Sequence, residues 1–303
     1  MTESPTDAPA PGVSVVMPVG SIDPHLDGAL LALAEQDADE RWELVLSLNT
    51  ADPAARTALE AAAAPVRDRG VEVRVIDSSD VRSAAHARNV GAEAARGERL
   101  AFCDGDDLAQ PDWLRRLLDG LDDHDAVGGH LAEEKLAIAG QEDWRPPATP
   151  GDNPSFLGHP FLVSANMAVR ASAFAETGGF DVTLIRGEDI AFSWSLLRNG
   201  ATLGFVPEAV IHYRHRKGLR PMLHQHYLYG RGMAQLLRRY GTPDGSSGLL
   251  SANNQPVVHR SKVHYLRRGA IAVGRVVGIG EGLVERVLTS RAEQPTGVGE
   301  GVH

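Results

Sequence analysis

The sequence predicts an α/β fold in which helices flank a mostly parallel β-sheet. First, four short apolar runs rich in β-formers occupy the first third of the chain, and stretches with helical spacing separate them. Second, Gly70 and Gly97 stand where a helix would end before the next strand begins. Third, 43% of the 303 residues are hydrophobic, which suffices for one large core. Strands that alternate with helices in this way form βαβ units and a parallel sheet.

The ligand-binding edge of this sheet follows from the order of the elements. The predicted strands cover residues 13–17, 43–48, 71–76 and 99–103, and the helices between them cover residues 24–36, 52–69 and 81–96. In open parallel sheets, ligands bind beyond the carboxyl ends of the strands. The loops 18–23, 49–52, 77–80 and 104–107 are therefore expected along one rim. Their acidic side chains suit a metal better than a bare phosphate.

The second part of the chain is less regular. We predict helices over residues 111–121, 188–199, 219–240 and 262–288, strands over 126–131, 161–169 and 201–206, a proline-rich loop over 133–160 and a linker over 241–254. Long loops of this kind usually serve as lids or substrate walls. The expected organisation is a disordered tail (1–12), one α/β domain (13–216), a C-terminal helical appendage (217–290) and a second disordered tail (291–303).

Composition and charge restrict the functional classes. Cys103 is the single cysteine, which excludes an internal disulfide and a cysteine-cluster metal site. We find neither a signal peptide nor an apolar run of roughly 20 residues, so we expect a soluble, cytoplasmic protein. The net charge of -10 disfavours nucleic acid as a partner. Residues 209–268, however, hold 11 Lys and Arg against one acid. This segment is either a contact to an anionic acceptor or to the inner face of a membrane, or simply a solvated helix face.

The strongest chemical signal follows the fourth predicted strand. The apolar residues 100–103 lead directly into Asp104, Asp106 and Asp107. Three neighbouring carboxylates repel one another unless a cation or several donors compensate them. Hard oxygen ligands select Mg²⁺ or Mn²⁺, which commonly bridge a substrate diphosphate. The alternative is an acidic turn that precedes the helix at Pro111.

A second acidic pair opens the helix at residues 188–199. Glu188 and Asp189 stand at its first turn, where the helix dipole favours negative charge, so one interpretation is simple capping. The functional interpretation is a general base that removes a proton from an attacking hydroxyl group. Arg186, two residues upstream, either neutralises diphosphate charge or pairs with a surface acid.

Taken together, six ordered stretches resemble a known family. They are residues 13–19 (VSVVMPV), 87–91 (ARNVG), 102–107 (FCDGDD), 166–170 (NMAVR), 178–181 (GGFD) and 187–189 (GED). In this order they resemble the inverting glycosyltransferase family 2, whose GT-A fold is built on a Rossmann-like sheet. The resemblance covers about residues 13–216. It implies a catalytic domain that moves one sugar from a nucleotide-diphosphate sugar to an acceptor hydroxyl group with inversion, and that uses Mn²⁺ or Mg²⁺.

The resemblance also implies roles for the two acidic groups. Asp106 is expected to hold the donor ribose and to share the metal with Asp107, while Asp104 supports both. Asp189 is expected to be the catalytic base, and Glu188 its neighbour on the acceptor side.

Four further residues are expected to bind the donor. Pro18 follows the first strand, Arg88 and Asn89 are expected near the nucleotide, and Arg186 near the diphosphate. For Arg88 and Asn89 there is a structural alternative, because residues of a helix also cap and pair.

Two positions carry separate expectations. His212 matches a position where some enzymes of the GT-A fold place a further metal ligand, although residues 212–215 also read as a basic loop. The family usually has an acid after its second strand that reads the base. Here Asn49 is the nearest match, and because an amide both accepts and donates, the sequence does not specify uracil.

The sequence supports other functions less well. A sugar-phosphate nucleotidyltransferase needs a Gly-rich, basic loop after the first strand, and residues 18–23 lack one; a dinucleotide-dependent dehydrogenase fails there too. A catalytically silent binding protein of the same fold remains an alternative, although both acidic groups are intact. The Gln-x-x-Arg-Trp pattern of processive synthases is missing, so we expect single transfers. The acceptor class stays open among lipid-linked, polysaccharide and small-molecule hydroxyls.

Overall fold

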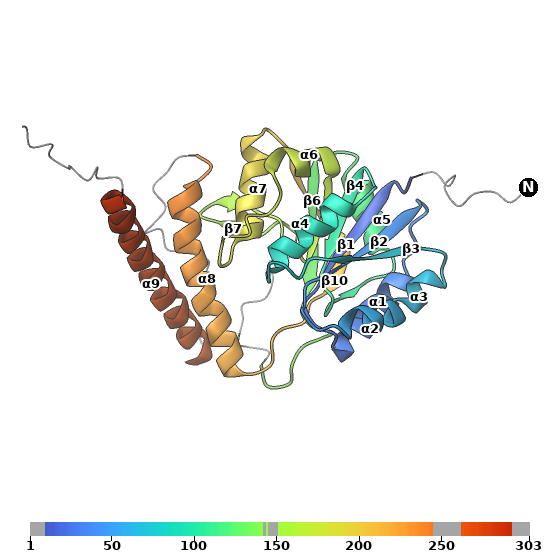
Figure 1. The fold of residues 1–303 in the computed structure, drawn as a ribbon, viewed down its shortest axis with the longest axis horizontal. Helices are drawn as coiled ribbons and strands as arrows, with labels where there is room; N and C mark the ends of the chain where they lie inside the picture. Colours follow the sequence, from blue (N-terminus) through green and yellow to red (C-terminus); the bar gives the residue numbers. More distant parts are fainter. Residues whose placement is uncertain (1–9, 142–143, 145–150, 245–261, 293–303) are drawn as a thin grey trace, which may run out of the picture.

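The computed structural model describes residues 10–141, 144, 151–244 and 262–292. A central eight-stranded sheet has the order β3-β2-β1-β4-β9-β6-β10-β5 (Figure 1). Its strands are β1 (Val13–Val19), β2 (Trp42–Leu48), β3 (Glu72–Asp77), β4 (Arg99–Cys103), β5 (Leu108–Ala109), β6 (Ala126–Ala132), β9 (Asn166–Arg170) and β10 (Leu203–His212). The helices are α1 (Pro24–Ala34), α2 (Ala55–Ala62), α3 (Ala64–Arg67), α4 (Ala84–Ala94), α5 (Trp113–Gly120), α6 (Ala171–Thr177), α7 (Glu188–Arg198), α8 (Leu219–Tyr240) and α9 (Lys262–Ala292).

The predicted fold class is confirmed. Strands β1 to β4 are parallel to one another, and β6 is parallel to β10. Strand β9 runs antiparallel to both β4 and β6, and β5 runs antiparallel to β10. Since β1 to β4 share one direction, the loops after them meet at one edge of the sheet. That edge is where the acidic residues 104–107 lie.

Two apolar layers cover the sheet. One face of β1, which includes Val13, Val15 and Met17, packs with residues of α1, α3 and α5. The other face of the sheet, which includes Val16 of β1 and Phe102 of β4, packs with residues of α4, α6 and α7. Side chains that alternate between two buried faces explain why these strands read as continuous apolar runs.

Several element boundaries differ from the prediction. The strand expected over 161–169 is confined to β9, because residues 161–165 leave the sheet as a loop, and α6 follows β9 unpredicted. The helix expected over 52–69 is split into α2 and α3, with Pro65 in the first turn of α3. The two-residue strand β5 and the hairpin of β7 (Ser155–Phe156) and β8 (His159–Pro160) carry too few residues for a periodic signal.

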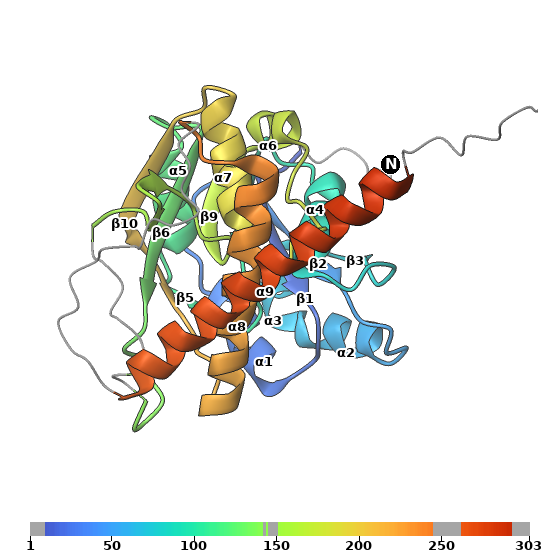
Figure 2. The same cartoon turned by 90° about the vertical axis from the view of Figure 1, so that its left-hand side faces the viewer.

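The predicted helical appendage is α8 and α9, which pack side by side outside the sheet domain (Figures 1 and 2). Glycines allow their backbones to approach: a Cβ on Gly274 would lie 2.0 Å from the carbonyl oxygen of Tyr227. Neither these helices nor any other described helix is long and apolar enough to cross a membrane. The domain boundaries stay predictions. Of the expected tails and linker, residues 1–9, 245–254 and 293–303 lie outside the described residues. Gly12, expected in the first tail, donates its backbone N–H to the carbonyl oxygen of Arg41, and α9 continues to Ala292.

Candidate active site

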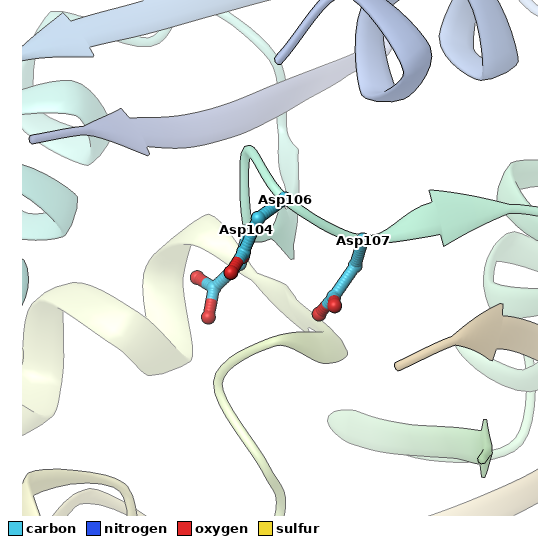
Figure 3. Close-up of side chains that lie close together, drawn as sticks. All are labelled: Asp104, Asp106 and Asp107. Atoms are coloured by element: carbon cyan, nitrogen blue, oxygen red, sulfur yellow. The ribbon is translucent and has the colours of Figure 1, made fainter. Parts of the chain in front are cut away.

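Three aspartates gather on the turn between β4 and β5. Asp104, Asp106 and Asp107 each offer a carboxylate oxygen, and these oxygens lie within 4.8 Å of one another. Figure 3 shows the three side chains extending from the turn beyond the end of β4. Gly105 allows the turn to lie close to β1, since a Cβ there would stand 3.3 Å from Leu26 and 3.8 Å from the carbonyl oxygen of Pro18. The predicted donor-side residue Pro18 therefore borders the acidic turn.

Asp107 is the most deeply buried of the three. Its side chain accepts a hydrogen bond of 2.7 Å from the backbone N–H of Arg214 through Oδ1, whereas its Oδ2 is buried and has no partner. Burial, followed by the charge of Asp104, raises the pKa of Asp107 to about 8. A buried carboxylate oxygen without a donor, beside two further carboxylates, matches the hard oxygen ligands that Mg²⁺ and Mn²⁺ require. The residues present therefore fit a divalent cation.

Arg88 of α4 connects this turn to the second acidic group. The buried guanidinium lies 2.6 Å from Asp104 through Nη2 and 3.7 Å from Glu188 through Nη1. It also lies over the ring of Phe180, 5.9 Å from its centroid. Burial alone would lower the pKa of Arg88, but the charges of Asp104 and Glu188 outweigh it and raise the pKa. Arg88 thus joins Asp104, on the turn after β4, to Glu188, at the start of α7, although these two residues are 84 positions apart in the sequence.

Asp189 and Glu188 form the first turn of α7. Gly187 precedes them with φ +88° and caps the helix without a side-chain hydrogen bond. The backbone N–H of Ile190 donates to Asp189 Oδ1 at 2.8 Å. Burial, followed by the charge of Glu188, raises the pKa of Asp189 to about 7. A carboxylate whose pKa lies near neutrality is suited to accept a proton.

Helix α8 holds the loop that leads to Asp189. Gln235 accepts a hydrogen bond of 2.9 Å from the backbone N–H of Ile185 and donates one of 3.0 Å to the carbonyl oxygen of Thr183. Tyr240 donates its hydroxyl to Asp181 at 2.9 Å. Gly232 faces the backbone of Arg186 so closely that a Cβ there would lie 2.4 Å from its carbonyl oxygen. Helix α8 is therefore part of the site's frame.

Two tyrosines that the sequence did not single out join the site. Burial raises the pKa of Tyr213, which follows β10, and the neighbouring charges of Asp104 and Asp107 raise it further. Burial, followed by the charge of Asp189, raises the pKa of Tyr229 on α8. Tyr213 adjoins His212, but Tyr229 is one of the apolar residues of the helix predicted over 219–240, so its sequence carried no separate signal.

Two predicted nucleotide-side residues are engaged with the backbone. The Nδ2 of Asn49 donates to the carbonyl oxygens of Ser78 and Val81, and its Oδ1 accepts from the N–H of Ser83 at 3.0 Å. Asn89 exchanges two hydrogen bonds with the backbone of Phe180, at 2.8 Å and 2.9 Å. Both side chains thus fix the loops beside the site, and their contact with a nucleotide stays a prediction.

The two remaining predicted residues lie at the borders. Arg186 is half-buried and donates to the carbonyl oxygen of Ile185 at 3.2 Å. His212 pairs with Leu108 across the β10–β5 ladder, and burial lowers its pKa. Within the part of the chain that the structure describes, the group of side chains close enough to share a metal ion consists of the three aspartates and does not include His212. Its role as a metal ligand stays a prediction.

Curated proteins supply one set of relatives. The chain is 28% identical over 200 residues to the pre-mycofactocin glycosyltransferase of Mycobacterium tuberculosis; the match covers 59% of this chain and 40% of that protein. It is also 28% identical over 120 residues to the uncharacterized glycosyltransferase EpsJ of Bacillus subtilis, covering 39% and 33% of the two chains. The chain therefore spans less than half the length of these relatives.

Solved structures share the fold. A mannosyltransferase, PcManGT from Pyrobaculum calidifontis in complex with GDP-Man and Mn²⁺, superposes with a TM-score of 0.61 at 17% identity, covering 96% of this chain and 83% of that chain. S. aureus TarS 1–349 in complex with UDP-GlcNAc gives a TM-score of 0.53 at 14% identity, covering 90% and 92%. The expected GT-A fold is thereby confirmed.

The family follows from the sequence models. The model of glycosyl transferase family group 2 matches residues 156–273, which include α7 and α8. The model of glycosyl transferase family 2 matches residues 14–178, which include β1 to β4 and the aspartate turn. Because this second match covers more than half of the 303 residues, the chain belongs to glycosyl transferase family 2.

Proposed function

We propose that the protein transfers a single sugar from a nucleotide-diphosphate sugar to an acceptor hydroxyl group, with inversion at the anomeric carbon. The observation that carries the proposal is the bridge formed by Arg88. It ties an aspartate turn fitted for a cation to Glu188, whose neighbour on the chain, Asp189, has a pKa near neutrality. A transferase needs these two groups close together, because the donor's leaving group and the acceptor's proton are handled in one displacement.

On the donor side, Asp106 and Asp107 would hold Mn²⁺ or Mg²⁺, with Asp104 in support. When bound, the cation supplies charge stabilisation for the departing nucleoside diphosphate. Asp106 also orients the donor ribose in this proposal, with Asn49, Arg88 and Asn89 framing the nucleotide side. Arg186 offsets negative charge on the diphosphate, since it precedes Glu188 on the loop that α8 fixes.

On the acceptor side, Asp189 acts as the general base. The acceptor oxygen forms a bond to the anomeric carbon while its proton passes to a carboxylate oxygen of Asp189. The bond between the anomeric carbon and the phosphate oxygen breaks, and the nucleoside diphosphate leaves with the electron pair. Glu188 borders the acceptor, and burial together with the charge of Glu188 raises the pKa of Asp189 enough for proton capture.

Nucleotide release from a panel of sugar nucleotides tests this function. The two solved neighbours bind GDP-Man and UDP-GlcNAc respectively, so the panel includes both guanosine and uridine donors. We expect Mn²⁺-dependent release of free nucleoside diphosphate, measured by a coupled assay with and without a chelator, against lipid-linked, polysaccharide and small-molecule hydroxyl acceptors. A silent binding protein would show a thermal shift with a nucleotide and no release with any donor.

The pH dependence of turnover checks the assigned base. Asp189 must be ionised to accept a proton, and its pKa is raised to about 7 by burial and by Glu188. At saturating donor and acceptor, kcat is therefore expected to fall as the pH decreases through about 7 and to level off above it. An acid limb near pH 4, where an ordinary aspartate titrates, would exclude Asp189 as the base.

Gln235→Met tests the contribution of α8. The variant keeps the side chain's length but removes both hydrogen bonds to the loop before Asp189. Because small misplacements of a catalytic group are costly, we expect kcat to fall by about 10- to 100-fold with little change in donor binding. His224→Met, an exposed position on the same helix, is the control and is expected to keep full activity. Equal activity of both variants would show that the loop needs no support from Gln235.

A further inference from the structure

Helix α9 presents an apolar stripe to the outside of the molecule. Seven of its large apolar side chains are 43% to 70% exposed: Tyr265, Leu266, Val273, Val276, Ile279, Leu283 and Val284. Intervals of three, four and seven residues place them on one side of the helix. In Figure 2 this helix crosses the face of the molecule that is turned toward the viewer, and in Figure 1 it lies on the far side of α8 from the sheet. Exposed apolar stretches of this size mark interaction surfaces.

The opposite side of α9 is fully used in packing on α8. Gly274 and Gly278 face backbone atoms of α8 at distances that exclude a larger side chain, and Gly282 faces the side chain of Arg238. The carboxylates of Glu281 and Glu285 form ion pairs of 2.5 Å and 2.7 Å with arginines of α8. The stripe is therefore not the contact that holds the two helices together.

The charged residues around the stripe indicate the kind of surface that it contacts. Lys262 and Arg268 are exposed beside its N-terminal half, whereas the acids Glu281 and Glu285 are turned toward α8. Lys217 and Arg220, near the start of α8, are also exposed. Basic side chains that flank an apolar stripe suit a surface of anionic lipid headgroups. A second copy of the same stripe would instead bring apolar surface together with like charges around its basic half.

We propose that α9 lies in the plane of an anionic membrane surface, with the stripe in the headgroup boundary. From Tyr265 to Val284 the stripe extends about 28 Å along the helix axis, at about 1.5 Å per residue. A helix of this length and amphipathicity binds along an interface and does not span it, which agrees with the finding that no described helix is apolar enough to cross a membrane. The inference is independent of the sugar-transfer reaction.

Co-sedimentation of the full chain with vesicles tests the proposal. We expect the protein to pellet with vesicles of phosphatidylcholine and phosphatidylglycerol, and to pellet at least tenfold less with phosphatidylcholine alone. Val276→Glu combined with Leu283→Glu is expected to reduce the bound fraction at least tenfold, because it places charges on the most exposed part of the stripe. The matched control is Leu31→Glu on α1, whose side chain is 52% exposed outside the stripe and which is expected to bind normally.

Two further measurements separate the alternatives. Lys262→Glu combined with Arg268→Glu is expected to abolish the preference for anionic vesicles. Wild-type protein that stays in the supernatant with both vesicle types would overturn the proposal. A wild-type dimer in light scattering that becomes a monomer in the Val276→Glu, Leu283→Glu variant would also overturn it, because a second copy would then cover the stripe. Nucleotide release from a sugar nucleotide, assayed without vesicles, is expected to be unchanged in all these variants. The test of membrane binding is therefore independent of the test of sugar transfer.

Discussion

Replacing Asp189 with asparagine is expected to lower the kcat of sugar transfer by about 10²- to 10⁴-fold, the usual contribution of a positioned general base. The amide keeps the shape of the side chain and can still accept the hydrogen bond that the N–H of Ile190 donates. It cannot capture a proton. Donor binding is expected to persist, because the proposed site for the metal and diphosphate is the separate turn at residues 104–107. The measurement is kcat beside the affinity for the donor, each with Mn²⁺ present.

Stability distinguishes lost chemistry from lost structure in this variant. The pKa of Asp189 is raised in the folded protein above its unfolded value, so ionisation disfavours the folded state at pH values above that unfolded value. Asparagine cannot ionise. The melting temperature of Asp189→Asn is therefore expected to equal or exceed that of the wild type at pH 8. Asp119→Asn, at an exposed position on α5, serves as the control with normal activity. Near-normal turnover in Asp189→Asn would show that another group is the base.

The parallel half of the sheet was predictable because its signal is local. β1, β2 and β4 are short, largely apolar runs buried on both faces, whereas the edge strand β3 is only partly buried. The helices that follow β1 and β3 each begin at a side-chain cap. Ser83, for example, caps α4 by accepting from the N–H of His86. The acidic turn was equally visible, since three aspartates follow a buried strand. Periodicity and caps therefore place this edge of the sheet from sequence alone.

What the sequence did not reveal depends on contacts between distant segments. Strand β9 is inserted between β4 and β6, and its antiparallel direction leaves no trace in its five residues. Arg88 lies 100 residues before Glu188, so no spacing rule announces their ion pair. Gln235 reads as a polar position of an amphipathic helix, yet it holds the loop before Asp189. Such roles arise from tertiary packing.

The second large effect is expected at Asp107. Asp107→Asn keeps an oxygen for the N–H of Arg214 but removes the carboxylate whose Oδ2 is buried without a partner. We expect the affinity for Mn²⁺ with a nucleoside diphosphate to fall about 100-fold. This is the upper end of the loss caused by removing a residue that only hydrogen-bonds to a metal ligand. The folded protein itself is not expected to lose stability. Burial raises the pKa of Asp107 to about 8, so its ionised form is disfavoured in the fold and the neutral amide relieves that cost above the unfolded pKa.

Thermal shift separates these two consequences of Asp107→Asn. A ligand at 100 times its dissociation constant stabilises the wild type by about 2.7 kcal/mol. In a chain of 303 residues, whose unfolding entropy is about 0.6 kcal/mol/K, that corresponds to a rise of about 4 °C in Tm. At the same concentration, a ligand bound 100-fold more weakly gives about 0.4 kcal/mol, a rise of about 1 °C. The variant is thus expected to melt at or above the wild-type temperature without ligand and to lose most of the Mn²⁺-dependent shift. A full shift in Asp107→Asn would mean that Asp107 is not a ligand of the cation.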